Sequence, residues 1–457
     1  MNQFERIKAM FYPLCFVGLL QAVSTTASDV EAPTPTQRLQ AQNAEFEKEL
    51  IQVAPNVYTG VGYAGSNASM IVGSDGVIII DTLPGLAAAE SLRADFLKVS
   101  DKPVKAIIYT HGHMDHVGGA KVFADDDAPD IYARSNSHVD RIDAGPRNSF
   151  SAKRAARQFG RTLKPGVERI NLGVGPAVQP MGGFGQGTLA PTISFASERQ
   201  RLTIAGIQVE LVAAPGETDD QLYVWLPESK VLFSGDNFYR SFPNIYALRG
   251  TPYRDIIPWA NSLEKMAGEK ADALVPGHTR PVKGADEIQQ TLTDYRDAIR
   301  FVHDKTVEGM NKGLVPDELV DYVKLPESLA SRHYLTEFYG RVDTAVRAVF
   351  SGYVGWFDGN PTNLSNLSPK GEASRMAALA GGEEALLNAL LDAQREADHV
   401  WALRLADHLI AMGSHRERAI EAKIESLRVL AEETLNAPTR NYYLSVANEL
   451  GTSVEAD

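Results

Sequence analysis

The sequence predicts a mixed α/β domain followed by an all-helical region. Between about residues 49 and 284, short apolar runs rich in β-branched residues alternate with Gly, Pro and Asp turns and with a few helical stretches, which is typical of α/β folds. From Ile288 to Met310 no Gly or Pro occurs until Gly309, and apolar residues recur at helical spacing. With 457 residues, the chain can form two or three domains of ordinary size.

The candidate strands of the α/β part are short apolar runs bounded by turn residues. They are Val57–Tyr63, Ser69–Val72, Val77–Ile80, Lys105–Tyr109, Val209–Ala213, Leu222–Leu226 and Val231–Phe233.

The stretch between Arg134 and Thr192 interrupts this alternation. It contains a basic patch from Lys153 to Arg161, which we expect to be a solvated helix face, although it could steer an anion. The glycine-rich run Gly182–Gly187 follows no clear strand and lacks a closing Lys-Ser/Thr pair, so a phosphate-binding loop is rejected. We expect a flexible rim there instead.

The C-terminal part predicts amphipathic helices. The segment Asp358–Gly382 is rich in Gly, Asn, Pro and Ser and predicts a linker or long loop. Gly413 predicts the end of one helix, and Ser414 with Glu417 predicts a capping box for the next. Antiparallel helix pairs of this kind more often mediate association than chemistry.

The first residues have the layout of a signal peptide that ends near residue 28. Arg6 and Lys8 precede an apolar stretch from Met10 to Val23, and small residues follow. A short membrane anchor is the alternative, but the apolar stretch is short and contains Pro13. We therefore expect an exported protein, periplasmic or secreted, without a stable membrane anchor.

Composition limits the partners and the metal chemistry. The only cysteine is Cys15, inside the predicted signal peptide, so histidine and carboxylate must hold any metal in the mature chain. The formal charge of −13 argues against nucleic acid or an anionic membrane as partner. An anionic substrate would need strong local positive charge in its site.

The strongest functional signal is a loop directly after the apolar run Ala106–Tyr109. His111 and His113 are alternate residues that can face one ion, while Asp115 and His116 can face a neighbouring one. A zinc site needs three or four such ligands, and this loop offers four within six positions. The alternative, four ordinary polar loop residues, is less probable in a chain with 10 histidines.

Further candidate ligands follow other apolar runs. Glu217, Asp236 and His278 each come directly after a glycine at the end of such a run. Asp81 occupies a similar position after Val77–Ile80 and is suited to orient a ligand histidine. Singly, each would be an ordinary turn carboxylate or surface histidine; together they indicate one site at an edge of a sheet.

This arrangement resembles the metallo-β-lactamase superfamily, in which an HxHxDH loop and three later ligands hold two metals between stacked sheets. The resemblance implies an αββα sandwich. Glu217, where that superfamily commonly has histidine, is similar to the alkyl sulfatases, whereas Asp236 stands where those enzymes typically have glutamate.

Two further stretches resemble the alkyl sulfatase branch. One is Asn244–Gly250 with Arg254 and Asp255, and the other is Gly352–Pro361, which looks like the start of that branch's helical dimerisation domain. The resemblance implies a catalytic domain over residues 29–310 and a helical dimerisation domain over 311–457, and hence a homodimer. The lipid-carrier-like C-terminal module of many alkyl sulfatases is expected to be absent.

The resemblance also implies the metal ligands. One Zn²⁺ would be held by His111, His113 and Glu217, the other by Asp115, His116 and His278, with Asp236 as the bridge. Asp115 and Asp236 are accordingly the predicted catalytic residues. Two such ions activate water and neutralise developing charge.

Four residues are predicted to bind substrate. Arg249 and Arg254 suit a sulfate group because a guanidinium matches oxyanions bidentately, although a structural ion pair is an equally open interpretation for either. Asn244 and Tyr246 either assist or pack.

The implied function is hydrolysis of alkyl sulfate esters to an alcohol and inorganic sulfate. The alternatives are a metallohydrolase of another ester, lactone or β-lactam, and a non-catalytic helical assembly protein. The sequence leaves open the length of the alkyl chain and whether the C–O or the S–O bond breaks.

Overall fold

The structure is a computed structural model that describes residues 32–137, 139, 147–178 and 182–456. Residues 34–457 form one compact unit, which contains all the helices and strands discussed below. The predicted signal peptide lies outside the described residues, so export stays a prediction. No helix in the described ranges has both the length and the apolar character needed to cross a membrane.

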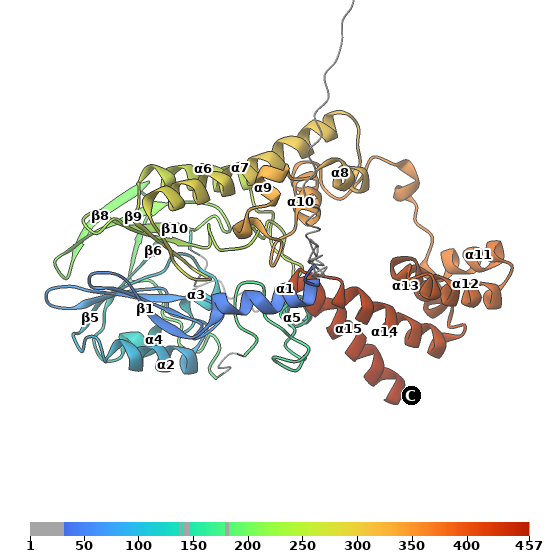
Figure 1. The fold of residues 1–457 in the computed structure, drawn as a ribbon, viewed down its shortest axis with the longest axis horizontal. Helices are drawn as coiled ribbons and strands as arrows, with labels where there is room; N and C mark the ends of the chain where they lie inside the picture. Colours follow the sequence, from blue (N-terminus) through green and yellow to red (C-terminus); the bar gives the residue numbers. More distant parts are fainter. Residues whose placement is uncertain (1–31, 138, 140–146, 179–181, 457) are drawn as a thin grey trace, which may run out of the picture. The chain divides into compact units, whose positions relative to one another are not determined.

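The first sheet has seven strands in the described residues, and their spatial order follows the chain (Figure 1). Pairing is antiparallel from β1 to β4 and parallel from β4 to β7. The strands are β1 (Glu49–Ala54), β2 (Val57–Val61), β3 (Ala68–Val72), β4 (Val77–Ile80), β5 (Val104–Ile108), β6 (Asp130–Arg134) and β7 (Ile193–Phe195).

The second sheet has six described strands in the order β13-β12-β11-β10-β9-β8. Its pairings are antiparallel except for that of β11 with β12. The strands are β8 (Arg199–Ile204), β9 (Ile207–Ala213), β10 (Leu222–Leu226), β11 (Val231–Gly235), β12 (Ala273–Pro276) and β13 (Val282–Lys283).

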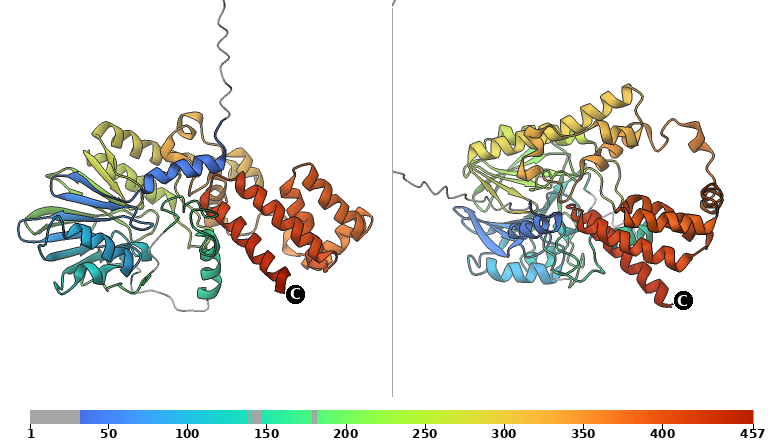
Figure 2. Two further views of the ribbon diagram at one scale, coloured as in Figure 1. Left: turned by 60° about the horizontal axis from the view of Figure 1, so that its bottom comes forward. Right: turned by 45° about the vertical axis from the view of Figure 1, so that its right-hand side comes forward.

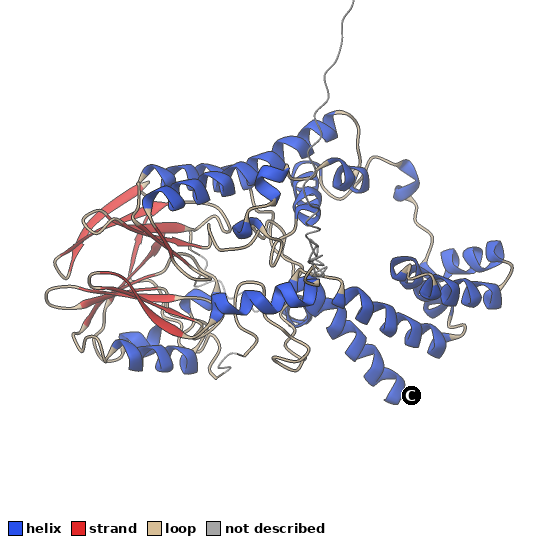
Figure 3. Cartoon of the chain, in the orientation of Figure 1, coloured by secondary structure: helices blue, strands red, loops and turns tan. Residues whose placement is uncertain are grey.

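The two sheets stack face to face with helices on both outer faces, as Figure 3 shows. Ile108 and Val224 belong to the apolar layer between the sheets. Leu92 and Phe123, from α2 (Leu86–Phe96) and α4 (Ala120–Ala124), cover the first sheet, and α6 (Ile256–Gly268) with α7 (Ala285–Asn311) covers the second. The predicted αββα sandwich is confirmed.

The chain from α7 onward is helical, as predicted. In Figure 2 the last helices lie side by side, and α12 to α15 pack successively against one another. The remaining helices are α1 (Pro35–Ala41), η1 (Gln42–Phe46), α3 (Met114–Val117), α5 (Arg147–Gln158), α8 (Pro316–Tyr322), α9 (Glu327–Ala330), η2 (His333–Leu335), α10 (Val342–Val354), η3 (Pro361–Leu364), α11 (Pro369–Ala380), α12 (Glu383–Arg395), α13 (His399–Met412), α14 (Arg416–Glu432) and α15 (Ala437–Ala456).

The predicted linker from Asp358 to Gly382 is wrong, because most of it is helical. Pro369 occupies the first turn of α11, where its missing N–H costs nothing, and Ser368 caps the helix by accepting from the backbone N–H of Gly371. The prolines in this segment therefore start helices.

One of the two predicted helix boundaries near residue 413 is confirmed. Gly413 ends α13 in the left-handed conformation, with φ of 77°. The capping box of Ser414 and Glu417 is wrong: the residue before α14 is His415, with no side-chain cap, and the Ser414 hydroxyl donates instead to Glu383.

Candidate active site

The histidine loop after β5 carries the first group of potential metal ligands. His111 Nε2 lies 3.0 Å from His113 Nδ1, which in turn lies 3.1 Å from Glu217 Oε2. Glu217 arrives from the turn between β9 and β10, and Asp236 follows β11. These four side chains place one potential ligand atom each within 4.8 Å of one another.

A second group lies beside the first. Asp115 and His116 belong to the short helix α3, and His278 follows β12. The Nε2 atoms of His116 and His278 each lie 3.6 Å from Asp115 Oδ2. The four strand ends that were predicted to carry metal ligands therefore meet at one edge of the sandwich.

Asp236 links the two groups. Its Oδ2 atom lies 3.6 Å from His111 Nε2, 3.4 Å from His116 Nε2 and 3.3 Å from His278 Nε2. A carboxylate in this position can contact ions on both sides, which is the bridging position predicted for it.

The donor set fits metal ions. His116 Nε2, Glu217 Oε2 and Asp236 Oδ1 are buried without a hydrogen-bond partner, a costly state that a cation would relieve. Ligand atoms about 2.0–2.1 Å from a tetrahedral zinc ion lie roughly 3.3 Å from one another. The spacings between His111, His113 and Glu217 range from 3.0 to 3.9 Å and bracket that value.

Hydrogen bonds on the far side of the rings orient two of the histidines. His116 Nδ1 lies 2.8 Å from Asp81 Oδ2, and His278 Nδ1 lies 2.6 Å from the Gly65 carbonyl oxygen. Both acceptors require Nδ1 to carry the proton, which leaves Nε2 free for a metal. Asp81 also accepts from the backbone and hydroxyl of Thr110, so it has the orienting position expected from the sequence.

Glycine before two of the ligands reflects close packing. A Cβ at residue 277 would collide with the Asp236 carboxylate, and one at residue 216 would collide with the Asn237 side chain. Only glycine allows the backbone before His278 and Glu217 to pass this close to its neighbours.

At Glu217 and His111 the surroundings favour the protonation state of a metal ligand. Burial alone would raise the pKa of the Glu217 carboxyl, but the charge of Arg254, with that of His113, holds this pKa well below its usual range. Arg254 Nη1 donates to Glu217 Oε1 over 2.6 Å. Burial, reinforced by the charge of His116, lowers the pKa of His111 to about 4, so the ring stays neutral.

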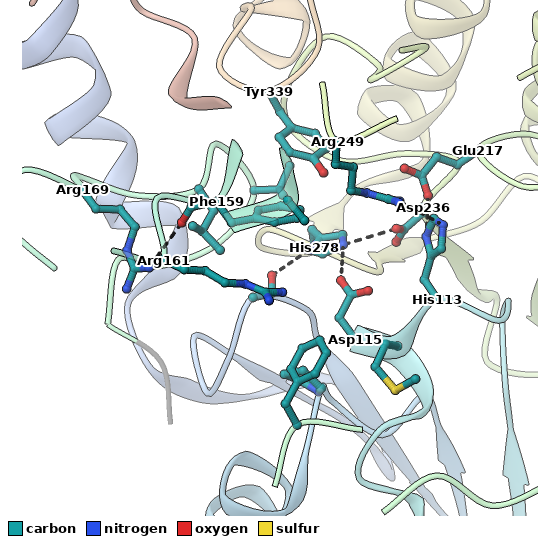
Figure 4. Close-up of a pocket in the computed structure, with 17 residues that line it drawn as sticks. His113, Asp115, Phe159, Arg161, Arg169, Glu217, Asp236, Arg249, His278 and Tyr339 are labelled. Carbon is teal, nitrogen blue, oxygen red and sulfur yellow. Dashed lines mark hydrogen bonds and ion pairs between the residues drawn. The ribbon is translucent and has the colours of Figure 1, made fainter. Parts of the chain in front are cut away.

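A pocket of about 310 Å³ opens onto these groups, and Figure 4 shows the side chains around it. His113, Asp115 and His278 are among its lining residues. Arg249 also lines it, with Nη2 3.4 Å from His113 Nε2, and has no carboxylate ion pair within the described ranges. Of the four predicted substrate residues, Arg249 is thus the one that lines the pocket.

The other three predicted substrate residues do not line this pocket. Arg254 is buried and donates to Glu217 and to the Asn244 carbonyl oxygen. The Tyr246 hydroxyl accepts a hydrogen bond of 3.1 Å from Arg154. Their positions support neighbouring side chains, and a direct role in substrate binding stays a prediction.

The pocket also contains residues that sequence reasoning missed. Tyr339 comes from the segment before α10, and burial, together with the charge of Glu217, raises the pKa of its hydroxyl. Phe184 belongs to the glycine-rich run that was predicted as a rim. Arg161 was expected on a solvated helix face, but α5 ends at Gln158, and Arg161 lies beyond it in the pocket wall.

Comparison with protein families divides the chain into two matched regions. Residues 61–278 match the metallo-β-lactamase superfamily. Residues 315–453 match the alkyl sulfatase dimerisation family.

Curated relatives extend the likeness over most of the chain. A linear primary-alkylsulfatase from Pseudomonas sp. (strain ATCC 19151) is 38% identical over 85% of this chain and 74% of its own length. An (R)-specific secondary-alkylsulfatase from Pseudomonas sp. is 32% identical over 88% of this chain, and an alkyl/aryl-sulfatase from Saccharomyces cerevisiae is 30% identical over 89%. The chain spans 62% and 64% of the lengths of those two relatives, respectively.

A solved structure agrees with these matches. The stereoselective inverting sec-alkylsulfatase from Pseudomonas sp. superposes with a TM-score of 0.83 at 29% identity, covering 91% of this chain and 67% of that one. The likeness includes both the sandwich and helices of the C-terminal region. The chain therefore belongs to the alkylsulfatase family of metallo-β-lactamase-superfamily hydrolases.

Proposed function

We propose that this chain hydrolyses alkyl sulfate esters with two zinc ions per chain. The observation that carries the proposal is the position of Asp236 between two ligand groups, with the Arg249 guanidinium beside them in the same pocket. A two-metal site next to an unpaired guanidinium suits an ester whose acid part is a sulfate.

Seven side chains would hold the metals. His111, His113 and Glu217 would take one ion, Asp115, His116 and His278 the other, and Asp236 both. Histidine nitrogen and carboxylate oxygen are suitable ligands for zinc. Two zinc ions would lower the pKa of a water molecule toward neutrality and offset negative charge on the departing oxygen.

The remaining side chains bind and orient the substrate. Arg249 would hold the sulfate oxygens bidentately, because its guanidinium is not committed to a carboxylate within the described ranges. Phe159, Leu172 and Val174 supply apolar wall for the alkyl part. The Tyr339 hydroxyl, whose pKa is raised by burial, stays protonated and can donate to a sulfate or ester oxygen.

The overall reaction consumes one water molecule per ester. The oxygen of water bonds either to sulfur or to carbon, the S–O or C–O ester bond breaks, and the products are the alcohol and hydrogen sulfate. Hydrolysis in ¹⁸O-labelled water distinguishes the two routes, because the label enters sulfate only when the S–O bond breaks.

The test combines metal analysis with sulfate release. We expect about two zinc ions per purified chain and release of sulfate from medium-chain alkyl sulfates. Asp236→Asn should lose metal and lower kcat/KM on the order of 10³-fold, since both ligand groups share this carboxylate. Asp272→Asn, the same change at a side chain that is 60% exposed, is the matched control and should behave like the wild type.

A different outcome would identify the alternative function. If the protein holds zinc but turns over only lactones, β-lactams or other esters, the sulfatase proposal is wrong and the metallohydrolase alternative stands. If Asp236→Asn keeps both zinc ions, the bridging role is wrong.

We also propose that the chain acts as a homodimer and outside the cytoplasm. The match of residues 315–453 to the alkyl sulfatase dimerisation family supports the first proposal. The basic and apolar layout of residues 1–28 supports the second.

A further inference from the structure

Two arginines line the pocket on the side away from the potential metal ligands Glu217 and Asp236. In Figure 4 Arg161 and Arg169 lie on the opposite side of the pocket from Glu217 and Asp236. Both side chains belong to the stretch between α5 and β7; sequence analysis expected Arg161 on a solvated helix face and made no prediction for Arg169. The pocket therefore has a second cationic group besides Arg249.

Within the part of the chain that the structure describes, no carboxylate forms an ion pair with either guanidinium. Across the described ranges, Arg161 makes no ion pair, and its guanidinium carbon lies 5.5 Å from the centre of the Phe184 ring. Arg169 is buried and donates to three backbone carbonyl oxygens, those of Phe159, Gly160 and Ala177. These carbonyl oxygens accept from the Nη groups of Arg169 but carry no net charge, and its Nε atom is buried without a hydrogen-bond partner in the described ranges.

The two side chains differ in burial: Arg161 remains accessible in the pocket wall, whereas Arg169 is buried. Desolvation lowers the pKa of Arg161, and desolvation together with the charge of Arg161 lowers the pKa of Arg169. Phe159, Leu172 and Val174 line the same pocket and carry no charge, and the Phe184 ring offers Arg161 only a cation–π contact. An anion between these walls would recover the lost solvation of Arg161.

A plain alkyl sulfate supplies only one anionic group. If its sulfate lies at the ligand cluster beside Arg249, its tail is apolar and leaves Arg161 without a partner. An alcohol part that ends in an oxyanion matches the whole pocket better, since it offers one anion to each cationic end and an apolar spacer to the walls.

We propose that Arg161, positioned next to Arg169, forms a subsite for a second oxyanion on the alcohol part of the substrate. The preferred substrates are then sulfate esters of hydroxy acids, with a carboxylate separated from the ester by an apolar chain. This inference rests on the proposed sulfatase function. The chemistry of the ester is unchanged, because no bond to the second oxyanion forms or breaks and it leaves on the alcohol product.

The experiment compares two matched series of substrates on the full chain. One series consists of ω-carboxyalkyl sulfates and the other of ω-hydroxyalkyl sulfates of the same lengths, so that only the second charge differs. At the best chain length, Arg161→Gln should lower kcat/KM for the carboxylate about tenfold, mainly through KM, and change kcat/KM for the hydroxy compound less than about twofold.

A second variant controls for general electrostatic attraction. Lys164→Gln removes one positive charge only three positions away, from an exposed side chain outside the pocket. It should leave both series unchanged. An equal loss for both series in Arg161→Gln, or an equal loss in Lys164→Gln, would show long-range steering of anions and overturn the subsite.

Two other results would also overturn it. If Arg161→Gln affects neither series, or if the wild type hydrolyses the hydroxy compounds but not the carboxylates, the subsite is wrong while the sulfatase function stands. If the wild type releases sulfate from neither series or from simple alkyl sulfates, the proposed function itself fails and the subsite with it.

Discussion

The edge of the sandwich that carries the potential metal ligands, here called the ligand edge, and the helical region α11–α14 bury opposite kinds of side chain. At the edge, the buried side chains are ionisable, and His116, Glu217 and Asp236 each keep a buried atom without a hydrogen-bond partner. In the helices, the buried core consists of leucine and alanine, with Leu390 and Leu405 among its most buried members. Both metal-ligand clusters found in the described residues lie at the edge.

The difference shows where stability and function are located. A cluster of buried charges is unfavourable by itself and depends on the surrounding fold and on a cation to hold it together. Packed leucines lower the free energy of the folded state without any ligand. Substitutions should therefore separate the two regions, since one should respond in metal affinity and the other in the free energy of unfolding.

The largest effect is expected from Leu405→Ala in the helical core. The Leu405 side chain is 1% exposed, so its truncation removes apolar contacts and leaves a cavity. The free energy of unfolding should fall by about 2–5 kcal/mol, measured by denaturant titration, with metal content and kcat unchanged at low temperature.

Two controls test whether stability and metal binding are located in separate regions: a conservative substitution at Leu405 and the metal content of Leu405→Ala. Leu405→Met keeps most of the volume and should cost less than about 1.5 kcal/mol. If Leu405→Ala loses bound metal as well as stability, the helical core and the edge with the potential metal ligands are coupled.

Asp81→Asn should have a smaller effect, located at the edge. It keeps the shape of the side chain but removes the charge that accepts from His116 Nδ1 and from Thr110. Metal affinity should fall about 10–100-fold, measured by competition with a chromophoric chelator. Asp75→Asn, in the exposed turn before β4, is the matched control, and an unchanged affinity in Asp81→Asn would contradict the orienting role.

The smallest effect is expected at an ion pair between α5 and the C-terminal helix α15. Arg157 of α5 pairs with Glu449 of α15 at 2.5 Å, and the hydrogen bond from Arg157 lowers the pKa of the Glu449 carboxyl. A carboxyl whose pKa is lowered by folding stabilises the protein above its unfolded pKa of about 4.3, and this contribution is lost as the pH falls through the folded value.

The measurement compares the free energy of unfolding of Glu449→Gln and the wild type from pH 7 down to pH 4. The wild type should be more stable by roughly 0.5–1 kcal/mol at pH 7, and the difference should shrink at acid pH. Loss of metal at low pH affects both proteins and cancels. Glu433→Gln, at an exposed acid of the same region, should show no such difference; a constant difference for Glu449→Gln would rule out the ion pair as its source.

Burial distinguishes several strands that sequence analysis found from two that it missed. The runs that became β4, β10 and β11 are buried along their whole length, and such continuous apolar runs are legible without a structure. The strands β7 and β8 were missed because they lie at sheet edges and carry exposed polar residues among the apolar ones. Ordinary loops show the same mixture of polar and apolar residues, so such strands cannot be told from loops by sequence pattern.

The sequence by itself determined the family and the candidate metal ligands, whereas the tertiary structure decided how the rest of the pocket is built. Four potential ligands lie within six consecutive positions of the chain, so their spacing can be read directly from the sequence. Arg161 and Tyr339 enter the pocket from segments far apart in the chain, and Arg254, which does not line it, pairs with Glu217. Those positions depend on how distant segments pack, because a side chain's partner is set by contacts that sequence spacing does not record.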